Sequence, residues 1–430
     1  MLACLITLDC AREDHVQGER ALTPCLDGFR EGAVTFTGAH AHTNTTLPSH
    51  VTMMTGLLMP EHGVTFNHCV PSKDHLLLTE RLAAKGARCA GFVGVSFLEK
   101  LYASKIDGSD PFYSLPSNRA LKKFVQRLGV RGSRRGAAQT ADKALRWIRS
   151  LGDQDAFCWV HLFDTHMDYL AAEKWRRHYE VPEERSGEPL DETLEKHALS
   201  SYHPVQGELR PLEYYPRMYR AAISHTDEVL GRFFEALRAM GRYDDALIVV
   251  TADHGENLLE HGVYCSHPLL FEETIRVPLV VKFPGGVHGG EEVHSHVGHR
   301  DLMPTILSHF GLDHQDDRCV NLAHHLGARD TGEERALFAF HNKMTQASVR
   351  RGPWVYIENL DLGSVRSQYR SLYDKVGLFD RKGTRVDDPD REAEMSRMIH
   401  AYLETADIEH HPAHLEEDEI KSHLQELGYL

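Results

Sequence analysis

Three apolar segments of this sequence each end on residues that can bind a metal ion or an anion. The segments and the residues after them are 1–8 with Asp9, 156–163 with Asp164-Thr165-His166, and 246–252 with Asp253-His254-Gly255-Glu256. A run of mostly apolar, β-rich residues predicts a buried strand. Any one of these acids could simply cap a helix. Three together favour one shared polar site, because the carboxyl ends of parallel strands meet at one edge of an open α/β sheet.

Asp253 and His254 offer one hard oxygen and one nitrogen in adjacent positions. This pairing suits Mn²⁺, Zn²⁺ or a similar divalent ion better than it suits Ca²⁺, which prefers oxygen alone. The carboxylate of Asp9, at the end of the first predicted strand, would add a second oxygen ligand. The sequence therefore predicts a divalent metal site formed by Asp9, Asp253 and His254.

Charge and hydropathy exclude several classes of partner. The formal net charge of the 430 residues is −15, which repels nucleic acid and anionic membrane surfaces. No apolar stretch approaches the roughly 18 residues of a membrane span. Because Met1 leads directly into the first predicted strand, a full-length chain of this sequence is expected to be cytoplasmic. The eight cysteines include no Cys-x-x-Cys pair, so buried, reduced thiols are expected.

Strand and helix patterns alternate up to about residue 310, which predicts an α/β sandwich with a mostly parallel central sheet flanked by helices. Helices are predicted at 79–85, 138–150 and 215–240, and further strands at 87–95 and 277–283. Beyond about 318, strand patterns at 336–340, 347–358 and 371–379 precede a helix pattern at about 390–405. We therefore expect a catalytic domain at 1–317 and a smaller α+β subdomain at 318–430.

Two excursions, 105–135 and 180–212, interrupt the alternation and are expected to shape specificity. The first contains a basic stretch, which is either a solvated surface or a docking patch for the tail of an anionic substrate. Its basic residues are Lys122, Lys123, Arg127, Arg131, Arg134 and Arg135.

The segment from Thr45 to Gly56 predicts a helix that carries a nucleophile. Pro48 suits a first helical turn and Gly56 a helix end, which places Thr46 just before the helix. A hydroxyl there could cap the helix. Alternatively, the helix N-terminus would stabilise an alkoxide or a bound anion, and the metal would lower the pKa of Thr46 further, making it a fourth ligand. His50, one turn later, could hydrogen-bond Thr46 or the anion.

These motifs resemble the sulfatases of the alkaline phosphatase superfamily, whose signature is Cys/Ser-x-Pro-Ser-Arg-x-x-x-x-Thr-Gly. The matching segments are Thr46-Leu47-Pro48-Ser49-His50 with Thr55-Gly56, Leu8–His15, Thr23–Asp27, Glu61–Val64, Asp253–Glu256 with Glu260–Gly262, Phe271–Glu273 with Ile275–Leu279, and Leu427–Leu430. They follow the family order across nearly the whole chain. The resemblance implies the sulfatase fold, the metal site and ester hydrolysis.

Four departures from the family pattern bear on the chemistry. Thr46 occupies the position of the Cys or Ser that becomes formylglycine, so no formylglycine is expected. His254 replaces the usual Asn of calcium-type sulfatases, Cys10 replaces the second Asp of a usual pair, and His50 replaces the usual Arg. By resemblance, branches with a Thr nucleophile are phosphodiesterases, nucleotide pyrophosphatases and phosphoethanolamine transferases.

The resemblance assigns roles to three further residues. Asn67 falls where phosphonate monoester hydrolases carry an Asn that contacts the anion. His166 is similar to the family's His that contacts the ester or protonates the leaving group, and His267 stands where sulfatases often have Lys. In the alternative, Asp164 joins His166 and His267 around a second metal, as in two-zinc members.

The sequence therefore predicts a metal-dependent hydrolase of phosphodiesters or phosphonate monoesters. Thr46 would form a phospho-enzyme, and His166 or His267 would protonate the leaving oxygen. The alternatives are a sulfuric ester hydrolase with an unmodified Thr, a transferase of a phosphoryl head group, and a non-catalytic anion-binding protein. The expected partner is a small anionic ester. Neither nucleic acid binding nor membrane insertion is expected, and the chain could form a homo-oligomer.

Overall fold

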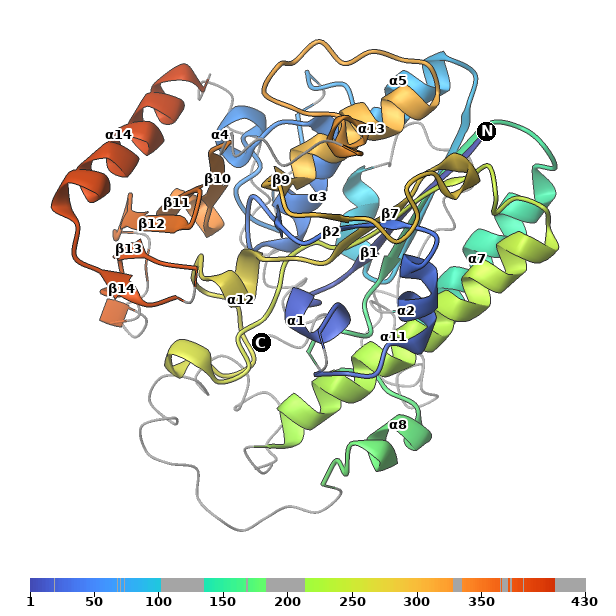
Figure 1. Cartoon of the computed structure of the whole chain (residues 1–430), viewed down its shortest axis with the longest axis horizontal. Helices are drawn as coiled ribbons and strands as arrows, with labels where there is room; N and C mark the ends of the chain where they lie inside the picture. The colour runs from blue at the N-terminus through green and yellow to red at the C-terminus, as the bar shows by residue number, and fades with distance from the viewer. Residues whose placement is uncertain are drawn as a thin grey trace, which may run out of the picture.

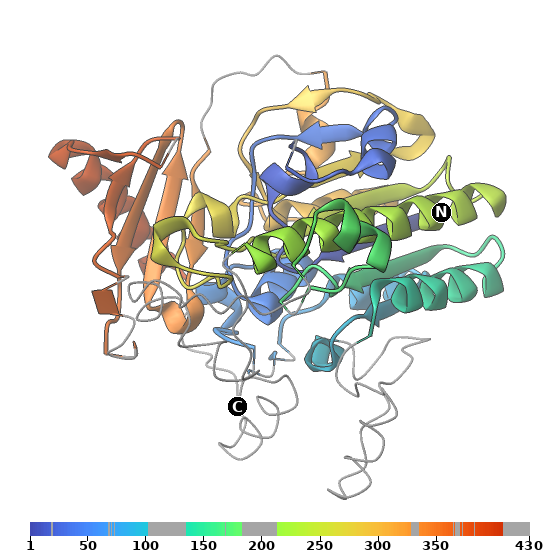
Figure 2. The ribbon, with the colours of Figure 1, turned by 90° about the horizontal axis from the view of Figure 1, so that it is seen from below.

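The computed structural model of the chain describes residues 1–101, 135–182, 213–327 and 335–406, apart from residues 19, 68, 70, 73, 168, 364, 366–369, 372 and 382. Most of the two excursions, the basic stretch up to Arg134 and the closing segment Leu427–Leu430 lie outside the described residues. Two layers of helices enclose a central sheet, and a smaller sheet stands at one end of the molecule (Figures 1 and 2).

The central sheet has seven strands in the order β4-β5-β1-β6-β7-β2-β8. Its middle is formed by β1 (Leu2–Leu8), which pairs in parallel with β5 (Ala156–Leu162) and with β6 (Leu247–Ala252). Leu8 is in register with Leu162 on one side and with Ala252 on the other. The three predicted strands are therefore neighbours, and the residues that follow them meet at one edge.

The outer strands make the sheet mostly, but not wholly, parallel. β4 (Arg88–Val93) is parallel to β5, whereas β7 (Leu279–Lys282) is antiparallel to β6. The remaining strands are β2 (Val34–Phe36) and β8 (Glu292–Val293), with a separate pair formed by β3 (Ala39–His40) and β9 (Val297–Gly298). The antiparallel turn-back of β7 keeps the long 253–278 connection at the edge where Asp9 and Asp253 lie.

Helices cover both faces of this sheet, as Figures 1 and 2 show. One layer contains α2 (Pro24–Arg30), α7 (Ala137–Ser150), α8 (Glu173–His178) and α11 (Tyr214–Ala239), and the other contains α3 (Thr46–Thr55), α5 (Leu78–Ala84) and α13 (Leu302–His309). Three short helices, α1 (Glu13–Val16), α4 (Met59–His62) and α12 (Glu272–Ile275), lie in connections. None of the helices in the described ranges combines the length and the apolar character that crossing a membrane requires.

The smaller sheet is antiparallel, with strands in the order β10-β11-β12-β13-β14. Its elements are β10 (Leu337–Phe340), β11 (Gln346–Arg351), β12 (Trp354–Asn359), β13 (Gly377–Phe379) and β14 (Arg385–Val386), covered by α14 (Pro389–Thr405). The predicted strand segment 347–358 is in fact a hairpin, because Gly352 turns the chain with φ 58°. Of the predicted segment 371–379, only the last three residues form a strand.

The two sheets share a boundary core. Phe340 of β10 and Ile399 of α14 pack in one apolar cluster with Leu58 and Met59, which lie at the start of α4. Burial of these side chains fixes the small sheet against the part of the chain that follows α3. The small sheet therefore lies next to the part of the main domain that contains α3 and α4.

Asp227 of α11 caps the neighbouring helix α2. Its Oδ2 accepts the backbone N–H of Cys25 (3.0 Å) and its Oδ1 that of Leu26 (2.8 Å), in the first turn of α2. Asp227 is 2 % exposed, and burial raises its pKa to about 6 despite these hydrogen bonds.

An Asp227→Asn variant is expected to gain stability relative to the wild type as pH rises. The folded-state pKa lies above the unfolded value, so the wild-type carboxyl contributes most below about pH 4 and loses about 3 kcal/mol as pH rises through about 6. Urea unfolding at about pH 4 and about pH 7 would measure the difference. Asp27→Asn, at an exposed position of the same helix, is the control. An equal difference between Asp227→Asn and wild type at both pH values would contradict the expectation.

Candidate metal and nucleophile site

Asp9, Asp253 and His254 come together at the carboxyl edge of the central sheet. Each can place one ligand atom within 4.8 Å of the ligand atoms of the other two, and all three side chains are fully buried. The register of β1 with β6 causes this, because the residues after Leu8 and Ala252 leave the sheet at the same level. The three residues predicted as metal ligands thus share one site.

Hydrogen bonds hold Asp253 so that one oxygen is left over. Its Oδ1 accepts the backbone N–H groups of Cys10 (3.0 Å) and His254 (2.9 Å), and Ser49 Oγ donates to its backbone carbonyl (2.7 Å). Its Oδ2 has no hydrogen-bond partner among the described residues. A buried carboxylate oxygen without a partner is costly unless a cation binds it.

His254 is held in the form that a metal requires. Its Nδ1 lies 2.9 Å from the Gly255 carbonyl, which can only accept, so the ring proton is on Nδ1. Nε2 is then the unprotonated nitrogen, 3.5 Å from Asp253 Oδ2 and 3.4 Å from Thr46 Oγ1. An imidazole oriented through its other nitrogen is the usual arrangement of a metal-binding histidine. The residues present therefore fit a divalent cation.

His161 holds Asp9 from inside the sheet. The backbone N–H of Gly94 donates to His161 Nδ1 (3.3 Å), which leaves Nε2 to donate to Asp9 Oδ2 (3.0 Å). The two side chains are fully buried. Sequence reasoning gave His161 no role because it lies inside an apolar run. The signal that could have found it is a lone imidazole in a buried strand, opposite Thr7 in the register.

Replacing His161 with phenylalanine is expected to weaken divalent-metal binding by about 10- to 100-fold, because Asp9 loses the donor that orients it. Titration of the metal-free protein by calorimetry would measure this affinity. Trp159→Phe is the control, since it removes another buried hydrogen bond of the same strand, from Trp159 Nε1 to Thr7 Oγ1, without touching Asp9. Unchanged affinity in a folded His161→Phe variant would show that His161 has no orienting role.

Thr46 is the first residue of α3, rather than the residue before it as the sequence predicted. The helix ends at Gly56, which takes the left-handed conformation with φ 73°. The N–H of Leu47 donates to the Asn67 amide oxygen (2.8 Å), so Asn67 occupies one of the open donors of this helix start. Thr46 and Asn67 thus lie together at the N-terminus of α3, with the Thr46 hydroxyl beside His254.

His50 faces the core from the same helix. Its Nδ1 donates to the Thr46 carbonyl (2.8 Å), and its Nε2 accepts from Thr7 Oγ1 (3.0 Å). Burial lowers the pKa of His50 to about 3, so the ring is neutral. His50 therefore contacts the backbone carbonyl of Thr46, and it stabilises the first turn of α3 from the core side.

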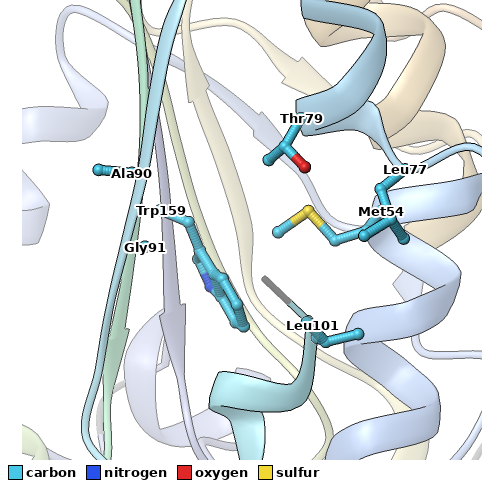
Figure 3. A pocket seen from close by; sticks show the side chains of 7 residues that line it. All are labelled: Met54, Leu77, Thr79, Ala90, Gly91, Leu101 and Trp159. Atoms are coloured by element: carbon cyan, nitrogen blue, oxygen red, sulfur yellow. The ribbon is translucent and has the colours of Figure 1, made fainter. Parts of the chain in front are cut away.

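An apolar cavity lies behind this network (Figure 3). It is lined by Met54, Leu77, Thr79, Ala90, Gly91, Leu101 and Trp159. The indole ring and the Met54 side chain point into it. Its lining offers no charged group to an anionic ester, so it is a gap in the core packing rather than a substrate site.

His166 and His267 flank the metal site on its outer side. His166 Nδ1 donates to the Met167 carbonyl (2.7 Å), and its ring stacks on Phe163 with 4.5 Å between centroids. His267 Nδ1 lies 3.3 Å from Glu256 Oε1, and burial lowers the pKa of His267 to about 4 and raises that of Glu256 to about 8. Glu256 is a further site residue, visible in the sequence only as the end of the Asp-His-Gly-Glu motif.

The segment that carries His267 is fastened by the C-terminal part of the chain. Asn44 Nδ2 donates to the carbonyls of His267 (2.6 Å) and Leu269 (2.9 Å), and Asn44 Oδ1 accepts from His341 Nδ1 (2.7 Å). His341 directly follows β10. No sequence pattern pointed to Asn44 or His341, because their partners are distant in the chain.

Asp164 belongs to none of the groups of described His, Cys, Asp and Glu residues whose ligand atoms lie within 4.8 Å of one another. Its Oδ2 accepts the N–H of Ala137 (3.0 Å), the first residue of α7, and so caps the start of that helix. Burial raises the pKa of Asp164 to about 6. Its Oδ1 has no hydrogen-bond partner among the described residues, so a second metal site built on Asp164, His166 and His267 stays a prediction.

The sequence of this chain matches a family model and several curated proteins. A family model described as Sulfatase matches residues 5–312. The multifunctional alkaline phosphatase superfamily protein PehA of Trinickia caryophylli is 28% identical over 193 residues, which cover 40% of this chain and 37% of that protein. N-acetylglucosamine-6-O-sulfatase of Bacteroides thetaiotaomicron is 32% identical over 103 residues, or 24% of this chain and 18% of that protein. These alignments thus span well under half of each curated relative.

Solved structures agree in fold. The phosphonate monoester hydrolase from Silicibacter pomeroyi superposes with a TM-score of 0.69 at 19% identity, and the one from Agrobacterium radiobacter with 0.67 at 19%. Each comparison covers 94% of this chain and 94% of the other. At this identity the likeness concerns the arrangement of the chain alone.

Proposed function

Because this chain belongs to the sulfatase family of the alkaline phosphatase superfamily, we propose that it is a metal-dependent hydrolase of small anionic esters, with phosphodiesters or phosphonate monoesters as substrates. The observation that carries the proposal is the position of Thr46. Thr46 is the first residue of α3, and its hydroxyl oxygen lies 3.4 Å from the unprotonated nitrogen of His254, which itself lies 3.5 Å from Asp253 Oδ2.

In the proposed reaction, Thr46 gives its hydroxyl proton to solvent, its oxygen forms a bond to phosphorus in line with the departing alcohol, and the bond between that alcohol and phosphorus breaks. A divalent cation held by Asp9, Asp253, His254 and Thr46 would supply charge that lowers the pKa of the Thr46 hydroxyl and neutralises the ester anion. The N-terminus of α3 stabilises negative charge on the non-bridging oxygens. Asn67 holds that helix start through the N–H of Leu47.

The leaving oxygen needs a proton, and two histidines are placed to give it. His166 and His267 lie on the outer side of the metal ligands, with ring centroids 6.3 Å apart. Each is oriented through Nδ1, by the Met167 carbonyl and by Glu256 respectively, so that Nε2 is the atom that can face an ester. The acid form is the imidazolium, which gives its Nε2 proton to the leaving oxygen and becomes neutral. Water then attacks the phospho-threonine, the bond between Thr46 and phosphorus breaks, and the neutral ring takes the proton of the water.

The donor set also supports a choice of cation. His254 contributes nitrogen, which favours Mn²⁺ or Zn²⁺ over Ca²⁺. We further propose that Thr46 acts unmodified, since formylglycine derives from Cys or Ser and the residue here is Thr.

Sulfate ester hydrolysis is the second candidate. One of the relatives of this chain is named N-acetylglucosamine-6-O-sulfatase, and another structure of this fold is described in complex with its substrate D-glucosamine-2-N,6-O-disulfate. A sulfate monoester and a phosphodiester each carry one negative charge at the reacting group. A site with one cation and a helix N-terminus can therefore accept either.

The deciding experiment compares turnover of a nitrophenyl phosphodiester with turnover of the matching nitrophenyl sulfate, with Mn²⁺ added. We expect the diester to have the higher kcat/KM, and we expect a chelator to abolish turnover until metal is restored. Dominant turnover of the sulfate would instead make the protein a sulfatase with a threonine nucleophile. Full activity in the presence of the chelator would refute the metal-dependent mechanism.

A further inference from the structure

Cys10 lies among the proposed metal ligands in a constrained conformation. It directly follows Asp9, is fully buried, and has a left-handed backbone with φ 57°. That conformation is uncommon for a residue other than Gly and persists only where the surroundings impose it. Here its N–H donates to Asp253 Oδ1 (3.0 Å) and its carbonyl accepts from Tyr219 (2.7 Å), so both ends of the residue are fixed.

The constraint aims the Cys10 sulfur at the nitrogen and oxygen donors of the site. Sγ lies 3.2 Å from Asp9 Oδ1. The Cys10, His254 and His267 ligand atoms all fall within 4.8 Å of one another, and so do those of Asp9, Cys10 and His166. Sulfur is thus the atom that the two sets have in common.

A second observation points independently to a cation at this place. Asp253 Oδ2, fully buried and unpartnered within the described part of the chain, lies 3.5 Å from His254 Nε2. His254 Nε2 is a single donor atom, because Nδ1 is engaged by the Gly255 carbonyl. His254 belongs to both the Asp9–Asp253–His254 set and the Cys10–His254–His267 set, and one nitrogen can bind one cation at a time.

We propose that Cys10 is a ligand of the active-site cation, which makes the ligand shell a mixed sulfur, nitrogen and oxygen set selective for Zn²⁺ or Co²⁺ over Mg²⁺, Ca²⁺ and Mn²⁺. Thiolate favours these softer ions, whereas carboxylate and water ligands suit Mg²⁺, Ca²⁺ and Mn²⁺. When the sulfur–metal bond forms, the S–H bond breaks, and the proton now shared with Asp9 passes to solvent. This inference rests on the proposed metal site, but not on the nature of the ester or on Thr46.

The test uses the full chain loaded with Co²⁺ and reads the absorption spectrum rather than activity. A sulfur ligand gives a near-ultraviolet charge-transfer band in addition to the visible bands of bound Co²⁺. We expect this band in the wild type, its loss with retention of the visible bands in Cys10→Ser, and its full retention in Cys89→Ser. Cys89 is an equally buried thiol on β4, bonded to the Thr79 and Ala87 carbonyls and not to the site.

Selectivity is measured on the same variants by metal titration. Cys10→Ser is expected to lower the affinity for Zn²⁺ at least about tenfold and to change that for Mn²⁺ by less than about threefold, since only the softer ion uses sulfur. Equal losses for both ions would overturn the selectivity that we propose.

X-ray absorption of the Zn²⁺-loaded wild type gives a reading that requires no variant, in case Cys10→Ser does not fold. One sulfur neighbour at about 2.3 Å is expected, and a shell of nitrogen and oxygen alone would overturn the proposal. Either result is independent of hydrolysis. A protein with zinc–sulfur scattering but no turnover would refute the proposed activity only, and an active protein without it would refute the role of Cys10 only.

Discussion

Replacing Thr46 with valine is expected to lower kcat for the nitrophenyl phosphodiester by at least about 10⁴-fold, because the variant has no oxygen to attack phosphorus. Valine has the shape of threonine, so α3 should begin at the same place. Thr46→Ser keeps the hydroxyl and should restore activity to within about tenfold of the wild type. Steady-state kinetics with saturating Mn²⁺ would measure both variants.

Thr45→Val is the matched control for Thr46→Val. Thr45 is the neighbouring residue, is equally buried, and makes no side-chain hydrogen bond to the start of α3. Its replacement should leave kcat almost unchanged. If Thr46→Val folds and retains the activity of Thr45→Val, Thr46 is not the nucleophile.

Asp253→Asn is expected to remove metal binding and activity while leaving the metal-free protein at least as stable as the wild type. The amide keeps the oxygen that accepts from Cys10 and His254, and it replaces the unpartnered oxygen by a neutral group. Without metal, the variant thus escapes the cost of a second buried carboxylate near Asp9, on the order of 1–3 kcal/mol. With metal, only the wild type gains stability.

Thermal unfolding with and without Zn²⁺ or Mn²⁺ would reveal this reversal. Asp301→Asn provides the contrast, since Asp301 is also fully buried but accepts from Gly298, Val320 and Arg335. Its replacement should destabilise the protein whether or not metal is present, because Arg335 loses its carboxylate. A loss of metal-free stability in Asp253→Asn as large as in Asp301→Asn would contradict the account of Asp253 as a cation ligand.

Much of the central sheet was predictable because its strands are continuous apolar runs with chemistry at their ends. The apolar runs before Asp9 and Asp253 form neighbouring parallel strands, so the residues that follow these strands lie close together. The helix that begins at Thr46 was predictable from Pro48 and Gly56, to within one residue. Local composition suffices in these cases, since burial and turn geometry are encoded by neighbouring residues.

The supporting residues were not predictable in the same way. His161 acts on Asp9 from the next strand, and His341 reaches Asn44 from the small sheet. These bonds depend on which strands become neighbours and on where the small sheet packs. The local pattern of apolar and polar residues predicts neither. Asp164 shows another such contact: one oxygen of its carboxylate caps the start of α7, which its position after a strand did not indicate.

The place of β1 in the middle of the sheet also bears on how the protein is made. Asp9 meets His161 of β5 and Asp253 and His254, which follow β6, so the site joins residue 9 to residues more than 150 and 240 positions later. During synthesis, β1 emerges long before β5 and β6. Its apolar residues therefore lack their partner strands until both have been made. The ligands Asp9, Asp253 and His254 come together only when β1 has paired with β6, the later of the two partners to be synthesised. Metal uptake by a refolding chain would therefore time the closure of the central sheet.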